Sequence, residues 1–147
     1  MIELLYQALA ICVFVGEASE CKTYKALNQA DRAQSNSNQS SVKCDGRAPD
    51  NIVSPGWYRM TGASGDQIPE KCVPMRRCGT HAPGWLNGKH PRLLEGVVTR
   101  RVCYHWSNNC CLWKNNIKIR NCGVYYVYEL QKPPACSLRY CGNNTGE

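Results

Sequence analysis

The sequence predicts a small disulfide-rich domain, mainly β, with antiparallel strands, one short N-terminal helix and five disulfide bonds. Three observations support this fold class. The chain of 147 residues contains 11 cysteines but only one phenylalanine. Its 18 Lys and Arg residues outnumber the 11 Asp and Glu residues. Short runs of β-branched and aromatic residues alternate with Gly, Pro and Asn, which is typical of strands joined by turns. A single domain of this length that is poor in aliphatic residues needs covalent cross-links for its stability.

The N-terminus is expected to be a leader. Residues 4–15 form an apolar run of 12 residues, and Gly16 and Ala18 are small residues at the positions that signal peptidase prefers. A membrane span needs about 20 apolar residues, so this run is too short. We expect residues 1–18 to be a signal peptide and residues 19–147 to be one secreted cysteine-rich domain. A buried helix is the alternative, because Glu3 stands where a basic residue usually begins a leader.

The expected mature chain is basic and has an even number of cysteines. It keeps all 18 basic residues and nine of the 11 acidic ones, so its net charge is +9. An even count after a secretory leader indicates disulfides formed in an oxidising compartment. The ten cysteines are Cys21, Cys44, Cys72, Cys78, Cys103, Cys110, Cys111, Cys122, Cys136 and Cys141. The C-terminal residues are polar and offer no lipid anchor, so we expect an extracellular protein without membrane insertion.

The elements follow in order along the chain. The spacing of Tyr24, Leu27 and Ala30 predicts a short helix over residues 22–33. Residues 34–41 contain no apolar side chain and predict a loop. Strands are expected at residues 57–60, 97–102, 117–121 and 124–130, and turns at residues 61–66 and 83–88.

The cysteines are expected to form disulfides and not to hold a metal. Cys110 and Cys111 point to opposite faces if the chain is extended there, so each should bond a different partner. Counting alone leaves about 945 pairings open. In a rival interpretation His81, His90 and His105 complete a zinc site. The sequence has no Cys-x-x-Cys pair, and oxidised sulfur does not bind zinc, so we expect no metal, no cofactor and no thiol-redox activity.

Signatures of catalysis and of nucleic-acid binding are weak. The GASG segment at residues 62–65 lacks the spacing of a nucleophile elbow. Asp66 and Glu70 lie in a predicted loop that is interrupted by Pro69, which does not favour a paired-carboxylate cleft. We therefore predict that the protein is not an enzyme. No nucleic-acid partner is expected in an extracellular chain without a nucleic-acid-binding motif.

The order of several short motifs resembles a known family. The motifs are GWYRM at 56–60, IPEKCVP at 68–74, RCGT at 77–80, WLNGKHP at 85–91, EGVV at 95–98, CCLW at 110–113, YYVY at 125–128 and PPACSLRYC at 133–141. Together they are similar to the eight- or ten-cysteine domain of uromodulin, the pancreatic zymogen-granule membrane glycoprotein and related zona-pellucida-domain proteins. The resemblance covers nearly all of the expected mature chain and is weakest at residues 34–54.

The resemblance implies a disulfide pairing and a role in recognition. The implied bonds are Cys21–Cys122, Cys44–Cys136, Cys72–Cys110, Cys78–Cys141 and Cys103–Cys111. In the family the domain is part of a decoy module whose N-glycans capture bacterial fimbrial adhesins. Two family acceptor positions correspond here to residues 87–89 and 129–131, which are not glycosylation sequons. We find neither an epidermal-growth-factor-like module nor a zona pellucida region in this chain, so the scaffold is expected to carry over and filament assembly is not.

Several residues are candidates for glycosylation or ligand binding. The sequons at Asn38 and Asn143 are compatible with glycans at surface positions. Aromatic rings can stack on sugars, but Trp57, Trp106 and Trp113 are expected mainly in the core. A ligand surface is expected to include Trp85, in a Gly- and Asn-rich loop, and the paired cations Arg76, Arg77, Arg100 and Arg101, with Lys114, Lys118 and Arg120 nearby. A solvated, solubilising face is the alternative for these cations.

These observations lead to a functional hypothesis with two alternatives. We expect a secreted, disulfide-stabilised binding module that recognises extracellular glycans, glycoproteins or microbial surfaces in mucosal-type defence. One alternative is a structural component of an extracellular matrix or coat. The other is a small cationic effector such as a toxin, which the net charge alone favours.

Overall fold

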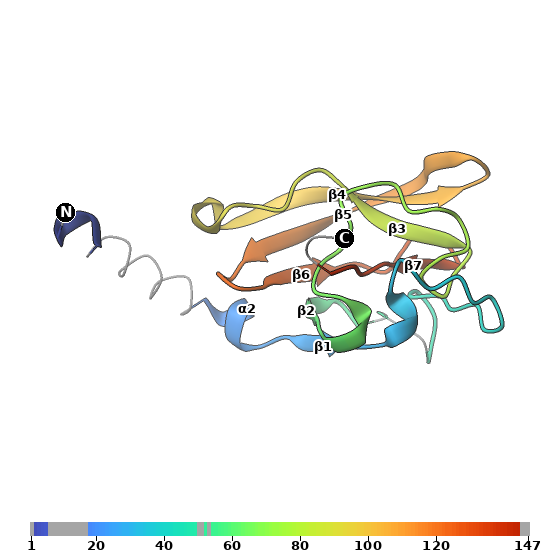
Figure 1. Ribbon diagram of the computed structural model, residues 1–147, viewed down its shortest axis with the longest axis horizontal. Helices are drawn as coiled ribbons and strands as arrows, with labels where there is room; N and C mark the ends of the chain where they lie inside the picture. The colour runs from blue at the N-terminus through green and yellow to red at the C-terminus, as the bar shows by residue number, and fades with distance from the viewer. Residues whose placement is uncertain (1, 6–17, 50–51, 53, 145–147) are drawn as a thin grey trace.

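The computed structural model describes residues 2–5, 18–49, 52 and 54–144 (Figure 1). Most of the expected leader and its cleavage region lie outside these residues. The strands are β1 Lys25–Leu27, β2 Gly56–Met60, β3 Ala82–Asn87, β4 Val97–Trp106, β5 Asn109–Asn121, β6 Tyr126–Leu130 and β7 Leu138–Tyr140. Helix α2 spans Ser19–Lys22, and three 3₁₀ helices are η1 Ala30–Arg32, η2 Gly62–Ser64 and η3 Leu93–Glu95. None of the described helices has the length and apolar character needed to cross a membrane. The predicted fold class, mainly β with a short N-terminal helix and five disulfides, is confirmed.

The strands form one mixed sheet in the order β1-β2-β6-β5-β4-β3-β7. The four inner pairings are antiparallel, as the sequence predicts. The two edge pairings, β1 with β2 and β3 with β7, are parallel, so an all-antiparallel sheet is wrong. A parallel pair needs a crossover connection and not a hairpin. The long loop between β1 and β2 and the wide separation of β3 and β7 in the chain supply these connections.

The longest pair, β4 and β5, is a hairpin joined by the two residues Ser107 and Asn108. Both residues have positive φ, 53° and 58°. This geometry is that of a type I′ turn, whose twist matches that of the flanking strands. The hairpin therefore extends the sheet beyond the core, as Figure 1 shows for β4 and β5.

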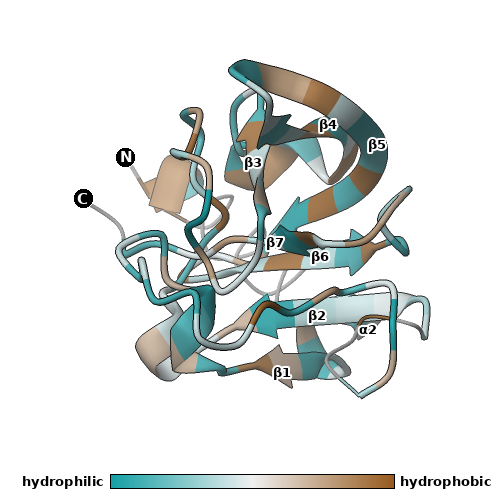
Figure 2. Cartoon of the chain, turned by 90° about the vertical axis from the view of Figure 1, so that its right-hand side faces the viewer, coloured by the Kyte–Doolittle hydropathy of each residue, from teal (hydrophilic) through white to brown (hydrophobic). Residues whose placement is uncertain are grey.

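The two edges of the sheet approach each other. Ala33, which follows η1, forms a parallel bridge with Gly142, which follows β7. The Gln34 N–H donates to the Gly142 carbonyl, and the Gly142 N–H donates to the Arg32 carbonyl. In Figure 2 β7 accordingly lies close to β6, although β5, β4 and β3 separate these two strands in the sheet order. The sheet curls around its core, and hydrogen bonds between the two ends stabilise this curvature.

Two local predictions are wrong. Residues 22–33 are not a helix, because β1 pairs with β2 and buries Leu27 against the sheet, whereas Ala30 is exposed. Residues 83–88 are largely strand β3 and not a turn. Gly84 lies in this strand because the Tyr104 ring packs on its backbone, where an added Cβ would be 2.8 Å from the ring. The predicted strands at residues 57–60, 97–102, 117–121 and 124–130 correspond to β2, β4, β5 and β6.

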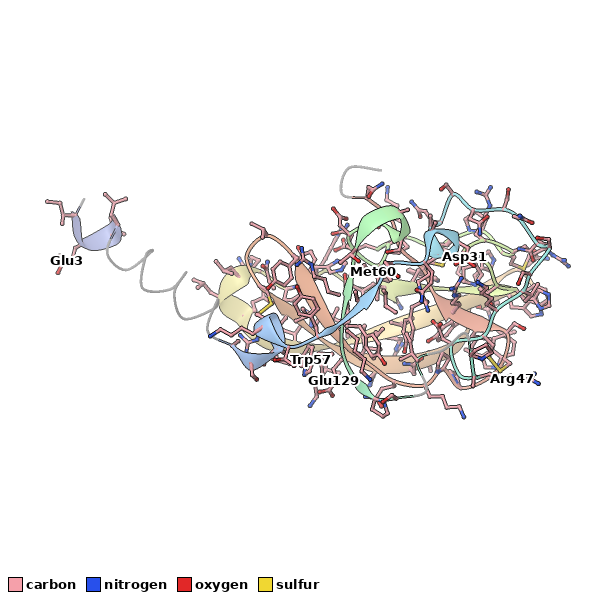
Figure 3. All side chains as sticks on the ribbon, turned by 90° about the horizontal axis from the view of Figure 1, so that it is seen from below. Glu3, Asp31, Arg47, Trp57, Met60 and Glu129 are labelled. Carbon is pink, nitrogen blue, oxygen red and sulfur yellow. A yellow bond between two sulfur atoms is a disulfide. The ribbon has the colours of Figure 1, made fainter. Side chains whose placement is uncertain are left out.

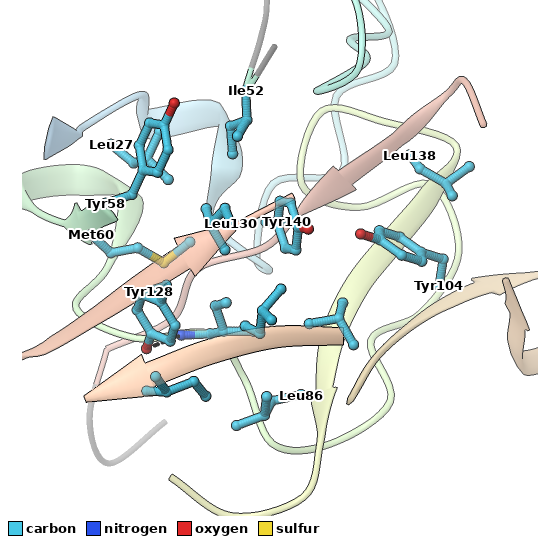
Figure 4. Packing of buried hydrophobic residues seen from close by; sticks show 14 of the residues in the cluster. Leu27, Ile52, Tyr58, Met60, Leu86, Tyr104, Tyr128, Leu130, Leu138 and Tyr140 are labelled. Atoms are coloured by element: carbon cyan, nitrogen blue, oxygen red, sulfur yellow. Dashed lines mark hydrogen bonds between the residues drawn. The ribbon is translucent and has the colours of Figure 1, made fainter. Parts of the chain in front are cut away.

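Tyrosines, and not tryptophans, form the aromatic part of the core (Figure 4). The main cluster contains Tyr58, Tyr104, Tyr128 and Tyr140, all less than 5% exposed. The Tyr104 hydroxyl donates to Asn115 Oδ1 at 2.6 Å, and the Tyr140 hydroxyl accepts from Asn115 Nδ2 at 2.9 Å. The Tyr58 and Tyr128 hydroxyls also have hydrogen-bond partners. Because each of these four hydroxyls is satisfied, a core of this composition is compatible with low aliphatic content. The four tryptophans are only half-buried.

A buried ionic network joins the loop before β2 to strand β7. Asp45 and Arg32 are both fully buried and form a bidentate pair with N–O distances of 2.6 and 2.8 Å. The Asp45 carboxylate also accepts the backbone N–H of Tyr140 at 2.9 Å. Arg139, 1% exposed, pairs with Asp31 at 2.9 Å. These contacts stabilise the region in which the two edges of the sheet meet.

Five disulfide bonds cross-link the described chain. They are Cys21–Cys122, Cys44–Cys136, Cys72–Cys110, Cys78–Cys141 and Cys103–Cys111, the pairs that the family resemblance implies. The neighbours Cys110 and Cys111 bond different partners, as expected for opposite faces of a strand. A disulfide is typically worth about 2–4 kcal/mol through restriction of the unfolded chain, so together the five bonds are a major contribution to stability.

Candidate functional site

The residues expected to form a ligand surface do not lie together. Trp85 is on strand β3 and not in an exposed loop. Its ring packs against a small buried cluster of Val73, Cys78 and Cys141, and its Nε1–H donates to the Cys110 carbonyl at 2.7 Å. The flanking Gly and Asn residues therefore gave a misleading signal. Trp85 connects β3 to the vicinal cysteines and is a poor candidate for sugar stacking.

The neighbours Arg100 and Arg101 point to opposite faces of β4. The Arg100 side chain donates to the carbonyls of Lys89 and Thr99 at 2.9 and 3.0 Å, and lies 3.7 Å from a carboxylate oxygen of Glu95. Arg101 is exposed and forms no ion pair with any described carboxylate. Adjacent residues of a strand alternate between faces, so paired cations in a sequence are divided when the pair lies in a sheet. Of the two, Arg101 is the one available to contact a ligand.

Arg101 belongs to a group of cations that the sheet register brings together. Across the hairpin it faces Asn116, and Lys114 and Lys118 lie two residues to either side of Asn116 on the same face of β5. Diagonal neighbours of this kind have β-carbons roughly 7–8 Å apart. We call Arg101, Lys114 and Lys118 the basic cluster. All three are exposed, and none pairs with a described carboxylate. Figure 2 shows the alternation of hydrophilic and hydrophobic residues along β5 that places these lysines on one face.

Arg76 and Arg77 lie in the turn-rich segment before β3. Arg77 donates to the carbonyls of Gln34 and Ser35 at 3.4 and 3.5 Å. Arg76 is exposed, and its guanidinium lies 5.5 Å from the ring centre of Trp106. Trp106 is on β4, at the end of the hairpin. Arg76 is therefore near an aromatic side chain that is distant from it in the sequence.

Trp106 and Trp113 line a pocket on the concave side of the hairpin. The cavity has a volume of about 90 Å³, which is room for several water molecules. We call it the aromatic pocket, and its lining residues are His81, Ala82, Trp106, Trp113, Cys136, Ser137 and Leu138. The His81 ring stacks on Trp106 with centres 5.4 Å apart. The Arg76 N–H donates to the His81 carbonyl at 2.9 Å, which holds Arg76 at the rim.

One group of described side chains has the spacing of metal ligands, but its chemistry does not fit. The Cys72 and Cys110 sulfurs and the His105 ring lie within 4.8 Å of one another. The two sulfurs are bonded to each other, and a thiolate is the form that binds metals. His105 Nδ1 also lies 2.7 Å from the Val73 carbonyl, which fixes it as a hydrogen-bond donor. The group is a cross-link supported by a hydrogen bond.

The sequence profile of a known family covers this part of the chain. The profile of the uromodulin-like cysteine-rich domain matches residues 58–142, which include the basic cluster, the aromatic pocket and the vicinal cysteines. The chain belongs to the uromodulin-like domain family.

Similarity to individual relatives extends beyond the profile. The chain is 42% identical to "Pancreatic secretory granule membrane major glycoprotein GP2" of Canis lupus familiaris over 94% of its own length and 29% of the relative's. It is 43% identical to the protein of that name from Homo sapiens, over 82% of this chain and 21% of the relative. It is 54% identical to "Uromodulin" of Rattus norvegicus, over 58% of this chain and 14% of the relative. The chain thus spans less than a third of the length of these relatives and is an extracellular type of module.

The two sequons of this uromodulin-like domain differ in accessibility. Asn38 is exposed, and its Oδ1 accepts the backbone N–H of Ser40 at 2.9 Å. Asn143 is 8% exposed, pairs with Gln67 in a short bridge, and has an Oδ1 that is buried without a hydrogen-bond partner. The expected surface position is therefore found at Asn38 and not at Asn143.

A buried histidine joins the loop before β4 to the core of the uromodulin-like domain. The Tyr128 hydroxyl accepts the Ile68 N–H at 3.1 Å, so its own proton is directed to His90 Nε2 at 2.8 Å. His90 Nδ1 then carries the ring proton and donates to Glu70 at 2.7 Å. Burial lowers the pKa of His90 and outweighs the opposing effect of Glu70. Burial raises the pKa of Glu70, but hydrogen bonds from His90 and Lys89 outweigh it and hold this pKa at about 2.

This chain of hydrogen bonds has a structural role. Tyr128 is fully buried, and burial raises its pKa far above the ordinary value, so it is not a nucleophile that a substrate could reach. The His90 ring also packs on Tyr126 with centres 4.3 Å apart. The arrangement stabilises the loop and supplies an ionisation that makes folding stability depend on pH.

Proposed function

We propose that the domain is an extracellular binding module that recognises acidic glycans on glycoproteins, cells or microbial surfaces through its basic cluster. The observation that carries the proposal is the exposure of three neighbouring cations, Arg101, Lys114 and Lys118, with no described carboxylate paired to any of them. Clustering like charges is unfavourable for folding. It becomes favourable when an anionic ligand is bound, and attraction to such a ligand also accelerates association.

The surroundings of the basic cluster are polar and suit a carbohydrate. Asn116 lies between the two lysines on β5, and Asn87 on β3 faces Arg101 from the other side. Amide groups of this kind donate and accept hydrogen bonds to hydroxyls. Glu129 on β6 faces Lys118 and partly offsets its charge. Figure 3 shows Glu129 beside Trp57, so this acidic position marks the edge of the surface.

The family supports an extracellular setting, and the remaining steps are proposals. We infer that residues 1–18 are removed on secretion, which N-terminal sequencing of protein from culture medium would test. The glycan decoys of the family are not expected at residues 87–89 or 129–131, because neither segment is a sequon. Recognition by the protein surface is therefore proposed in place of presentation of a glycan.

Binding to heparin, a sulfated polysaccharide, and to uncharged dextran tests the proposal. The oxidised protein should bind heparin and not dextran, and the affinity should fall with added salt. Changing the whole basic cluster to Gln should weaken heparin binding about tenfold or more. The matched control changes Arg47, Lys71 and Lys132 to Gln, which removes the same charge from exposed positions outside the cluster. Figure 3 shows Arg47 at the far end of the domain from Glu129.

The outcomes separate a site from a general charge effect. Equal losses in the two triple variants would attribute heparin binding to net charge alone and overturn the proposed surface. Absence of heparin binding at low salt would also overturn it. If the protein instead co-purifies with insoluble extracellular material after all cluster charges are removed, the structural matrix or coat function is favoured.

A further inference from the structure

We propose that the aromatic pocket is a seat for the terminal anionic sugar of a glycan. In this arrangement one face of the sugar ring stacks on Trp113, and its carboxylate or sulfate pairs with Arg76. The proposal deepens the function proposed above and depends on it, but it concerns a different face of the sheet. Trp106 and Trp113 lie on the concave side, whereas the basic cluster lies on the convex side.

Trp113 has an aromatic face with no competing partner. No described ring or cation stacks on it, whereas Trp106 is contacted by His81 and Arg76. A half-buried indole that lines a cavity presents a flat apolar surface, and the C–H groups of a pyranose match such a surface. The surroundings fix Trp106 and leave Trp113 available.

The charge at the rim determines which sugars fit. Arg76 is exposed, makes no ion pair with a described carboxylate, and has its backbone held at both ends. Its N–H donates to the His81 carbonyl at 2.9 Å, and its own carbonyl accepts from Gln39 Nε2 at 2.7 Å. A guanidinium fork recognises carboxylates and sulfates through paired hydrogen bonds. No described Asp or Glu lines the pocket, so nothing in its lining repels an anion.

The size of the pocket limits the ligand to the end of a chain. A volume of about 90 Å³ is smaller than the several hundred Å³ typical of sites that enclose a whole small molecule. A ring substituent enters the cavity between His81 and Trp113, and the rest of the sugar remains on the surface. The expected ligand is therefore a terminal pyranose that carries one negative group, either a carboxylate or a sulfate.

Three trisaccharide- or disaccharide-sized probes test the pocket: 3′-sialyllactose, 3′-sulfolactose and lactose. Titration calorimetry should give the two anionic probes an affinity about tenfold higher than lactose. Trp113→Ala should weaken the anionic probes about five- to tenfold, and Trp57→Ala, which removes a half-buried Trp from β2, should not. Arg76→Gln should reduce the anionic probes to the level of lactose, and Arg47→Gln is its matched control. Arg76 is exposed, so this variant keeps the test informative even if Trp113→Ala does not fold.

The results distinguish this proposal from the one on which it depends. Equal affinity for lactose and the anionic probes, or unchanged binding in Arg76→Gln, overturns the pocket. If heparin binds through the basic cluster but none of the small probes binds, the pocket fails and the proposed function stands. If the small probes bind and require Arg76 while heparin does not bind, the pocket stands and the basic cluster fails. The stronger of the two anionic probes identifies the charged group.

Discussion

Replacing Asp45 with Asn should cause a large loss of stability. The Asp45 carboxylate is fully buried and accepts two hydrogen bonds from the Arg32 guanidinium, at 2.6 and 2.8 Å, and one from the Tyr140 N–H. Asn has nearly the same shape but removes the negative charge and one acceptor. Arg32 is fully buried and has no other carboxylate partner among the described residues, so its charge would be left uncompensated.

The size of this loss follows from the cost of a buried unpaired charge. Removing one partner of a buried ion pair typically costs about 3–5 kcal/mol. Arg139 retains its contact with Asp31 at 2.9 Å, so we expect the lower part of this range. With an m-value of about 4 kcal/mol/M for guanidinium chloride, the unfolding midpoint should fall by about 1 M. Denaturation followed by fluorescence, with all disulfides oxidised, measures this change.

A charge-matched variant provides the control. Glu95→Gln also removes one carboxylate, but this group is exposed and pairs with Arg92 at the surface. Its midpoint should stay within experimental error of the wild type. If Asp45→Asn has the same midpoint as Glu95→Gln, then the buried pair is not a determinant of stability, and our assignment of the network at the junction of the sheet edges is refuted.

Three further predictions concern pH, packing and glycosylation. Stability should fall on acidification, first below pH 6.5 as the depressed pKa of His90 is approached, then from pH 4.5 towards the Glu70 pKa of about 2. Glu70→Gln should flatten the more acidic part of the denaturation profile, and a slope unchanged by this variant would contradict the assignment. Gly142→Ala should destabilise by about 1–3 kcal/mol or more, because the new Cβ would overlap the Ser64 carbonyl; an unchanged thermal midpoint would be evidence against this close approach. Protein from a glycosylating host should carry a glycan at Asn38, which is exposed, and peptide mapping that finds this site empty would show the expectation to be wrong.

The local sequence was informative where the signal is itself local. Four strands were predicted because alternating and β-branched residues are a property of each segment alone. The vicinal pair Cys110 and Cys111 required two different partners for a geometric reason that also holds within one strand. The family and its disulfide pairing followed from the order of short motifs and not from any one of them. Strand β3 was missed because its Pro and Gly are typical of turns, and only the approach of Tyr104 explains why Gly84 lies in a strand.

Residue order and composition were enough to establish a basic, cysteine-rich, mainly β domain of the uromodulin-like family. Which side chains meet depends on folding. Strand pairing divides Arg100 from Arg101 and groups Arg101 with Lys114 and Lys118, because side chains alternate between faces while neighbouring strands set the register. The hairpin likewise brings Trp113 to His81 and, through Trp106, to the region of Arg76. A binding surface depends on distances across strands, and such distances exist only once the chain is folded.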